Sequence, residues 1–149
     1  GGKALFAQDI TDPEDVKFLW EKTAADIPEL GNTLGKPIIA QVANGDWRVL
    51  IGNGPNSAAE TAQLIMIGVE SGTATVRTTG VAGNNGLSAV DAWDTDRDGF
   101  YDTVYGGDLL GNMWRFTGAG GGTAATNKLF TAIGPDSNVQ PITAAFVAE

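Results

Sequence analysis

The sequence predicts an all-β fold, in which antiparallel meanders of short strands form the blades of a partial β-propeller. Apolar residues occur in short runs bounded by Gly, Asn, Asp and Ser, and they almost nowhere follow the 3.6-residue period of an amphipathic helix. Similar segments open at Pro37, Ser88 and Pro141, about 50 residues apart, which is typical of a propeller blade. A β-sandwich with evenly spaced strands is the alternative interpretation of this pattern.

The first strands precede the repeat and are predicted to belong to an incomplete blade. They are Ala4–Asp9 and Val16–Trp20. Four apolar runs then form the first complete repeat: Pro37–Val42, Trp47–Gly52, Gln63–Val69 and Thr73–Arg77. Within this repeat, Asn44-Gly45 is the clearest hairpin signal of the chain, because Asn-Gly tolerates the positive φ angles of a tight turn.

The second complete repeat follows the same plan. Its predicted strands are Ser88–Trp93, Asp102–Tyr105, Asn112–Phe116 and Lys128–Ala132. The tract Gly118–Thr126 is rich in glycine, and we expect an exposed loop that does not pack. Pro141–Val147 is predicted to begin a further blade. Residues 1–149 are therefore predicted to be a segment of one β-propeller domain, with about two complete blades and a partial blade at each end.

The number of blades identifies one expected partner. Propellers close with about four to eight blades, and two complete units with two partial ones fall short of that number. On its own such a segment forms an open arc, whose two ends expose sheet surface that invites pairing with another chain. The remainder of the propeller is therefore the first partner that the sequence predicts.

The composition excludes several classes of function. The 149 residues include no Cys and no His, which removes disulfides, thiolate or imidazole metal sites and every mechanism that needs an imidazole base. The net charge of −9 argues against nucleic acid or an anionic membrane surface as a partner. The longest apolar run, Leu64–Val69, is far shorter than a membrane span, so no direct membrane insertion is expected.

One acidic loop carries the strongest chemical signal. The stretch Asp94–Asp102 has carboxylates at positions 1, 3, 5 and 9 and a glycine at position 6. Calcium takes six to eight oxygen ligands, and a tight loop can direct alternate side chains toward one centre while the glycine makes the sharp turn. The predicted Ca²⁺ ligands are the side chains of Asp94, Asp96, Asp98 and Asp102 and the backbone carbonyl of Phe100.

The flanking residues define the type of loop. An EF-hand needs Glu at position 12, where this chain has Tyr105, and the flanks are strand-like rather than helical. We therefore predict a nine-residue, EF-hand-like calcium loop that joins two strands. Magnesium is disfavoured because it retains its waters and seldom fills a site made only of protein ligands. The alternative is a solvated acidic turn, since Asp and Gly are common turn residues.

Other candidate sites carry weaker signals. Asp108 is either a further ligand or, as we prefer, a turn carboxylate. The four tryptophans recur once per strand group and are expected to pack between blades rather than to form a docking surface. Gly52–Ser57 resembles a glycine-rich phosphate loop, but no lysine or helix follows it, so we expect a strand connection. No nucleophile and base stand out as a pair, and no enzymatic activity is expected.

The motifs together resemble one family. The resemblance runs through nearly the whole chain, and its most specific parts are the acidic loop, the Tyr105–Phe116 string and the Gln140–Ala144 string. Further matching stretches are Ala4–Pro13, Leu34–Pro37, Asn44–Trp47 and Gly52–Ser57. In these residues the chain is similar to the C-terminal propeller of PilY-type pilus-biogenesis factors.

The resemblance implies a fold, a location and a role. The domain would be a modified β-propeller of the quinoprotein-like type, in an exported bacterial protein at the cell surface, pilus or outer membrane, with the secretion signal outside this segment. Such proteins promote type IV pilus assembly, oppose retraction and contribute to adhesion. The resemblance also implies that calcium occupancy biases pilus extension against retraction. Pilus proteins or a host surface would be the partners of the full-length protein.

Two other functions remain as alternatives. A generic extracellular adhesive propeller would use the same calcium loop only as a structural staple. A quinoprotein dehydrogenase fragment would also combine a propeller with calcium, but its metal must hold a cofactor and therefore needs open coordination positions and ligands from separate blades. A contiguous loop that nearly saturates its own ion disfavours this enzyme.

Overall fold

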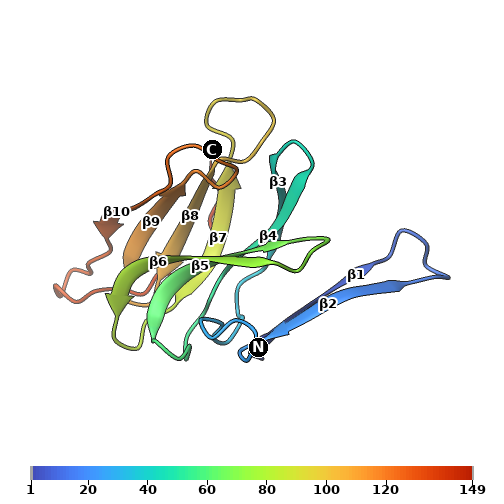
Figure 1. Ribbon diagram of the computed structural model, residues 1–149. Helices are drawn as coiled ribbons and strands as arrows, with labels where there is room; N and C mark the ends of the chain where they lie inside the picture. The colour runs from blue at the N-terminus through green and yellow to red at the C-terminus, as the bar shows by residue number, and fades with distance from the viewer. Residues whose placement is uncertain (1, 149) are drawn as a thin grey trace.

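A computed structural model describes residues 2–148 and contains a two-stranded hairpin and two four-stranded antiparallel sheets. Figure 1 shows these three units following one another along the chain from blue to red. In each four-stranded sheet, strands that are neighbours in the sheet are also neighbours in the sequence, so each sheet is a meander. We call them the first blade and the second blade. The predicted all-β, antiparallel fold is confirmed. Among the described residues, no helix is long and apolar enough to cross a membrane.

The strands largely match the predicted ones. The hairpin consists of β1 (Ala4–Asp9) and β2 (Lys17–Thr23). The first blade consists of β3 (Ile38–Ala43), β4 (Asp46–Gly52), β5 (Thr61–Gly68) and β6 (Ala74–Ala82). The second blade consists of β7 (Leu87–Trp93), β8 (Thr103–Asp108), β9 (Asn112–Thr117) and β10 (Ala125–Thr131). Each predicted strand before Pro141 overlaps one of these elements and differs from it only at the ends.

The packing of the blades explains the continuous apolar run in β5. This strand lies in the middle of the first blade, and seven of its eight residues are buried. On one face, Leu64 and Met66 contribute to the core shared with the second blade. On the other face, Ile65 and Ile67 pack toward Trp20 and the β1–β2 hairpin. Because successive side chains of a strand point to opposite faces, a strand covered on both faces is apolar throughout.

A buried amide fixes the connection between the two blades. Asn53 follows β4 directly and is completely buried. Its side chain donates to the carbonyl of Thr61 (2.9 Å) and accepts from the backbone N–H of Gln63 (3.0 Å) and of Leu87 (2.9 Å), the first residue of β7. Asn53 therefore joins the β4–β5 connection of the first blade to the first residue of the second blade. This tract is the strand connection that the sequence predicts.

The corresponding position of the second blade holds Asp108, the last residue of β8. Its fully buried carboxylate accepts from Trp114 Nε1 (2.8 Å), from the backbone N–H of Asn112 (2.8 Å) and from the side chain of Asn85 (3.0 Å). Several charge-assisted hydrogen bonds keep a carboxylate stable without a metal ion. The interpretation of Asp108 as a turn carboxylate agrees with this geometry.

The C-terminal segment Pro141–Val147 is not the predicted strand. It crosses the face of the second blade that carries Trp93, Tyr105 and Met113, and its residues 145–146 also lie beside residues 36–39 at the start of the first blade. Only single hydrogen bonds hold it there. The N–H of Ile142 donates to the carbonyl of Asp108 (3.0 Å), and that of Ala148 donates to the carboxylate of Asp91 (2.7 Å). The apolar pattern predicted a strand, but a strand also needs a neighbour with which to form a ladder, and this segment has none among the described residues.

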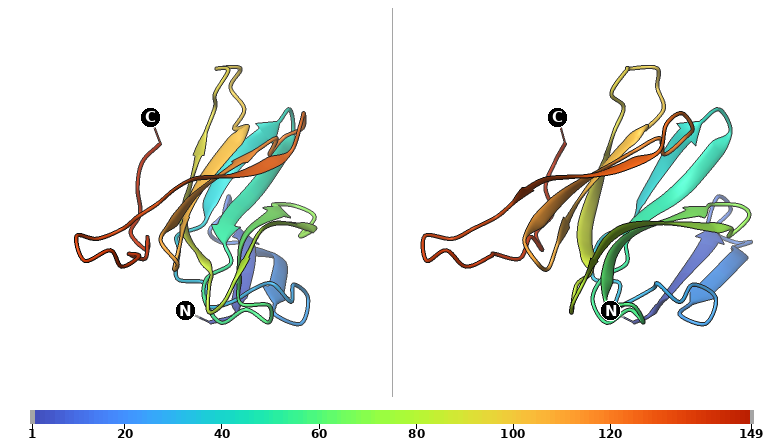
Figure 2. Two further views of the ribbon diagram at one scale, coloured as in Figure 1. Left: turned by 90° about the vertical axis from the view of Figure 1, so that its left-hand side faces the viewer. Right: turned by 60° about the vertical axis from the view of Figure 1, so that its left-hand side comes forward.

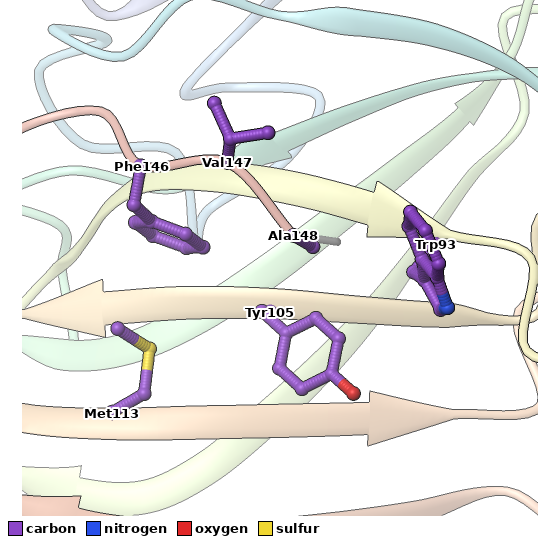
Figure 3. A pocket seen from close by; sticks show the side chains of 6 residues that line it. All are labelled: Trp93, Tyr105, Met113, Phe146, Val147 and Ala148. Carbon is purple, nitrogen blue, oxygen red and sulfur yellow. The ribbon is translucent and has the colours of Figure 1, made fainter.

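The same face carries an open hollow that is lined by aromatic and aliphatic residues. Figure 3 shows Phe146 above the sheet, with Trp93, Tyr105 and Met113 contributed by three successive strands of the second blade. Trp47 is also half exposed, whereas Trp20 and Trp114 are buried. The prediction that all four tryptophans pack between blades is therefore correct for two of them only.

Candidate metal centre

The acidic loop Asp94–Asp102 joins β7 to β8. Figures 1 and 2 show it extending from the end of the molecule where the β3–β4 hairpin also turns. Its own backbone hydrogen bonds determine its course. The Asp94 carboxylate accepts from the N–H groups of Arg97 (2.7 Å), Asp98 (3.2 Å) and Gly99 (2.8 Å). Gly99 has a φ of 93°, so the glycine at position 6 is needed for the turn.

Three carboxylates converge inside this loop. Oxygen atoms of Asp94, Asp96 and Asp102 all lie within 4.8 Å of one another. Asp98 is not among these three residues, and its Oδ1 accepts the N–H of Phe100 (2.8 Å). Asp98 and Phe100 nevertheless line the same hollow as Asp96 and Asp102. The structure thus brings three of the four predicted carboxylates together and leaves the roles of Asp98 and of the Phe100 carbonyl as predictions.

Asp102 supplies the observation that bears most directly on a bound cation. Its Oδ2 accepts from both the N–H and the hydroxyl of Thr95. Its Oδ1 is buried and has no hydrogen-bond partner in the protein. A buried acceptor without a partner costs about 1–3 kcal/mol, and more when it is charged. A cation between the three carboxylates would satisfy this oxygen, so the residues fit a metal ion.

The carboxylates of the loop differ in their electrostatic environment. The pKa of Asp96 is raised from its ordinary value, first by desolvation and then by the charges of Asp98, Asp102 and Asp94. Burial also acts to raise the pKa of Asp102, but the hydrogen bonds from the hydroxyl and the N–H of Thr95 act against it, and the pKa is lowered. Asp102 therefore remains ionised while Asp96 experiences the repulsion of its neighbours.

No basic side chain of the described part of the chain relieves this repulsion. The two salt bridges found there join Lys17 to Asp15 and Arg48 to Asp46, and neither involves the loop. Arg97 lies within the loop without forming an ion pair with its aspartates. A divalent cation is the simplest neutralising partner for such a cluster.

The glycine-rich tract between β9 and β10 is exposed at residues 121–124, as the sequence predicts, but its first part packs, which the sequence does not predict. Ala119 is buried, and Gly120 lies so close to the first blade that an added Cβ would be 1.5 Å from the carbonyl oxygen of Val42. Gly120 to Gly122 line the hollow that contains Asp96 and Asp102. The composition predicted a lack of side chains, but the close approach of another blade is a tertiary contact that composition cannot reveal.

Sequence reasoning also missed Thr95. The spacing of the acidic residues gives no role to position 2 of the loop, and yet Thr95 orients the carboxylate of Asp102 through two hydrogen bonds. A hydroxyl residue inside an acidic loop is the signal that could have indicated it, because Ser and Thr commonly bond to nearby polar groups in turns.

Comparison with known proteins identifies the family. A family model described as the PilY1 beta-propeller domain matches residues 1–143. The chain belongs to the PilY1 β-propeller family. The match to the family model confirms the resemblance that the motifs indicated. Together with the two four-stranded meanders, it also confirms the predicted propeller class.

Relatives of known name agree with this membership. A type IV pilus biogenesis factor PilY1 homolog of Xylella fastidiosa is 55% identical over 117 residues, which cover 78% of this chain and 10% of that protein. The type IV pilus biogenesis factor PilY1 of Pseudomonas aeruginosa is 45% identical over 119 residues, with the same two coverages. The chain thus spans about a tenth of the length of these PilY1 proteins.

A solved structure of the family has the same fold. The crystal structure of the Pseudomonas aeruginosa PilY1 C-terminal domain aligns with a TM-score of 0.86 at 35% identity, over 97% of this chain and 34% of that one. The two blades and the hairpin therefore correspond to about a third of that PilY1 domain.

Proposed function

We propose that this chain is a calcium-binding structural and regulatory module of a type IV pilus biogenesis factor, and that calcium occupancy biases pilus extension against retraction. The pilus role is supported by membership of the PilY1 family and by the names of its relatives. The calcium role is supported above all by the buried, unpartnered oxygen of Asp102, which is one of the three residues of the acidic triad.

Calcium is the cation that this set of ligands suits. Every candidate ligand is an oxygen, and the chain has no Cys or His to favour zinc. Carboxylates spread along one loop suit the variable geometry of calcium, whereas magnesium requires a near-ideal octahedron. Asp94, Asp96, Asp98 and Asp102, with the carbonyl of Phe100, are the residues we assign to hold Ca²⁺.

The protein prepares the loop for the ion. Three backbone amides already orient Asp94, and Thr95 orients Asp102, so little of the loop must rearrange on binding. The bound ion supplies the positive charge that removes the repulsion between the carboxylates. The connection between Trp93 and Thr103 would then be more rigid, and this change in rigidity is the regulatory signal.

The module acts by binding rather than by catalysis. In the described part of the chain no nucleophile and base pair accompanies the acidic loop, and the candidate ligands lie on one contiguous loop rather than on separate blades around a cofactor. We assign the full-length protein to the bacterial surface or the pilus, where pilus proteins or a host surface would be its partners in assembly and adhesion.

Calcium titration of matched variants tests the site. Isothermal titration with CaCl₂ should show that Asp102→Asn lowers the calcium affinity by at least about 10-fold, because the substitution removes a charged ligand. Asp136→Asn is the control, since Asp136 also accepts a backbone N–H in an exposed turn but lies outside the loop. Undiminished affinity in the Asp102 variant would exclude the loop as the site.

A cellular experiment tests the regulatory role. Bacteria whose pilus factor carries Asp102→Asn should show altered pilus retraction at millimolar calcium, while the Asp136→Asn strain behaves as the parent. The purely structural alternative is favoured by the hydrogen bond from Tyr101 N–H to the Gln41 carbonyl (2.9 Å), which ties the loop to the first blade. If calcium changes only the melting temperature and retraction is unchanged, the calcium is a structural staple.

A further inference from the structure

The hollow beside the acidic loop is lined by both blades. Its volume is about 340 Å³, and the second blade contributes Asp96, Asp98, Phe100 and Asp102 together with Gly120 to Gly122. The first blade contributes Val42, Ala43 and Asn44, from the hairpin between β3 and β4. Figure 2 shows the hairpin and the loop at the same end of the molecule in both views. The candidate site is therefore not confined to the loop that carries the aspartates.

Backbone contacts fasten the loop to the first blade. The N–H of Tyr101 donates to the carbonyl of Gln41 on β3 (2.9 Å). The N–H of Ala119 donates to the carbonyl of Asp102 (3.0 Å), which joins the acidic loop to the glycine-rich tract. Gly120 in that tract packs directly on the Val42 carbonyl. Three segments thus meet at the triad: the acidic loop, the glycine-rich tract and the end of β3.

An arginine of the first blade holds both ends of the glycine-rich tract. Arg77 on β6 donates to the carbonyl of Thr117 (2.9 Å), directly before the tract, and to that of Ala125 (2.6 Å), near the end of the tract. Its guanidinium also lies over the ring of Phe116, 5.9 Å from the centroid. The tract is therefore anchored to the first blade at its ends through Arg77 and near its middle through Gly120.

The acidic loop supplies fewer oxygen ligands than calcium takes, so a residue of the first blade can supply a further one. The loop offers four carboxylates and one carbonyl, whereas calcium takes six to eight oxygens. Asn44 is the residue with a polar side chain among the three that line the hollow from the first blade. Its amide oxygen is a suitable calcium ligand, either directly or through one water molecule.

Resting on the proposed function, we propose that the calcium site is shared between the two blades. Asn44 completes the site from the first blade, and calcium binding clamps the β3–β4 hairpin to the acidic loop. Occupancy of the site is then transmitted to the packing between blades and is not confined to one turn.

Substitution of Asn44 tests its role as a ligand. Isothermal titration with CaCl₂ should show about 10-fold weaker binding for Asn44→Ala and restored binding for Asn44→Asp, which retains an oxygen. Asn44 is not among the residues with positive φ, so alanine is compatible with this turn. Asn127→Ala is the control, because Asn127 is an exposed asparagine of β10 outside the hollow.

Hydrogen exchange of the unmodified chain tests the clamp independently of any variant. Addition of CaCl₂ should slow the exchange of the Tyr101 amide and of amides 41–44 by at least about 10-fold, while amides in the β1–β2 hairpin are unchanged. If the unmodified chain binds no calcium, the proposed function itself fails. If it binds calcium but Asn44→Ala binds as tightly and exchange at 41–44 does not change, the shared site alone is wrong.

Discussion

The connection between β3 and β4 and the connection between β7 and β8 occupy the same place in two successive blades. The first is the two-residue turn Asn44-Gly45, and the second is the loop from Asp94 to Asp102. Both contain a glycine with positive φ, 75° at Gly45 and 93° at Gly99. The short turn reverses the chain with the minimum number of residues, whereas the long one adds a cluster of carboxylates.

The difference shows how a repeated scaffold acquires a site. The strands that flank the two connections form similar four-stranded meanders, so the additional residues of the second connection are not needed for the blade. The two connections also lie near each other, because residues of both line one hollow. The shorter turn thus serves as one wall of the site that the longer loop carries.

The largest effect is expected when the acidic loop is replaced by a turn like that between β3 and β4. Replacement of residues 94–102 by Asn-Gly should abolish calcium binding and leave the β-sheet circular dichroism spectrum unchanged. Saturating calcium, about a thousandfold above Kd, should stabilise the parent by about 4 kcal/mol and the variant not at all. Urea unfolding with and without CaCl₂ measures both values. Calcium stabilisation that survives the replacement would place the site elsewhere.

A single substitution, with a smaller expected effect, tests the contact between the glycine-rich tract and β3. Gly120→Ala should lower the free energy of unfolding by about 1–3 kcal/mol, because the new methyl group collides with the Val42 carbonyl and separates the blades. Chemical denaturation measures this loss. Gly2→Ala is the control, since a Cβ there meets nothing within 4 Å. Equal stability of both variants would contradict the tight contact.

The smallest expected effects are on the stability of variants of the two turn glycines, Gly45 and Gly99. Gly45→Ala and Gly99→Ala should each cost about 1 kcal/mol without calcium, because alanine is strained at positive φ. With saturating CaCl₂ the cost should increase only for Gly99→Ala, since a bound ion fixes the turn around Gly99. Thermal melts of the two variants with and without calcium supply the comparison. An equal dependence on calcium at Gly45 and Gly99 would remove the proposed difference between the turns.

Local chemistry made both turns predictable from the sequence. Asn44-Gly45 needs only a residue that tolerates positive φ, and the acidic loop needs only its own spacing of Asp and Gly. The two blades were likewise predictable from strand-length apolar runs that recur at a nearly constant interval. Each of these signals lies within a few residues of the feature it predicts, or repeats along the chain.

Contacts between distant segments were not predictable in this way. The packing of Gly120 on Val42 and the hydrogen bonds of Arg77 depend on how the blades face each other. Pro141–Val147 has the composition of a strand, but a ladder requires a neighbouring strand as well as suitable residues. The triad without Asp98 also depends on the course of the loop, because spacing alone does not determine which carboxylates converge.

The buried polar residues at the ends of β4 and β8 affect how the number of repeated units in such a protein can increase. Asn53 receives the first N–H of the following blade through its side chain, and Asp108 receives the N–H of Ile142 through its carbonyl. Each blade therefore holds the segment that follows it through a polar residue at the end of its second strand. A tandem duplication of one unit in the gene would insert a copy that already has both this polar residue and the segment that fits it, so the array could lengthen without redesign of its neighbours.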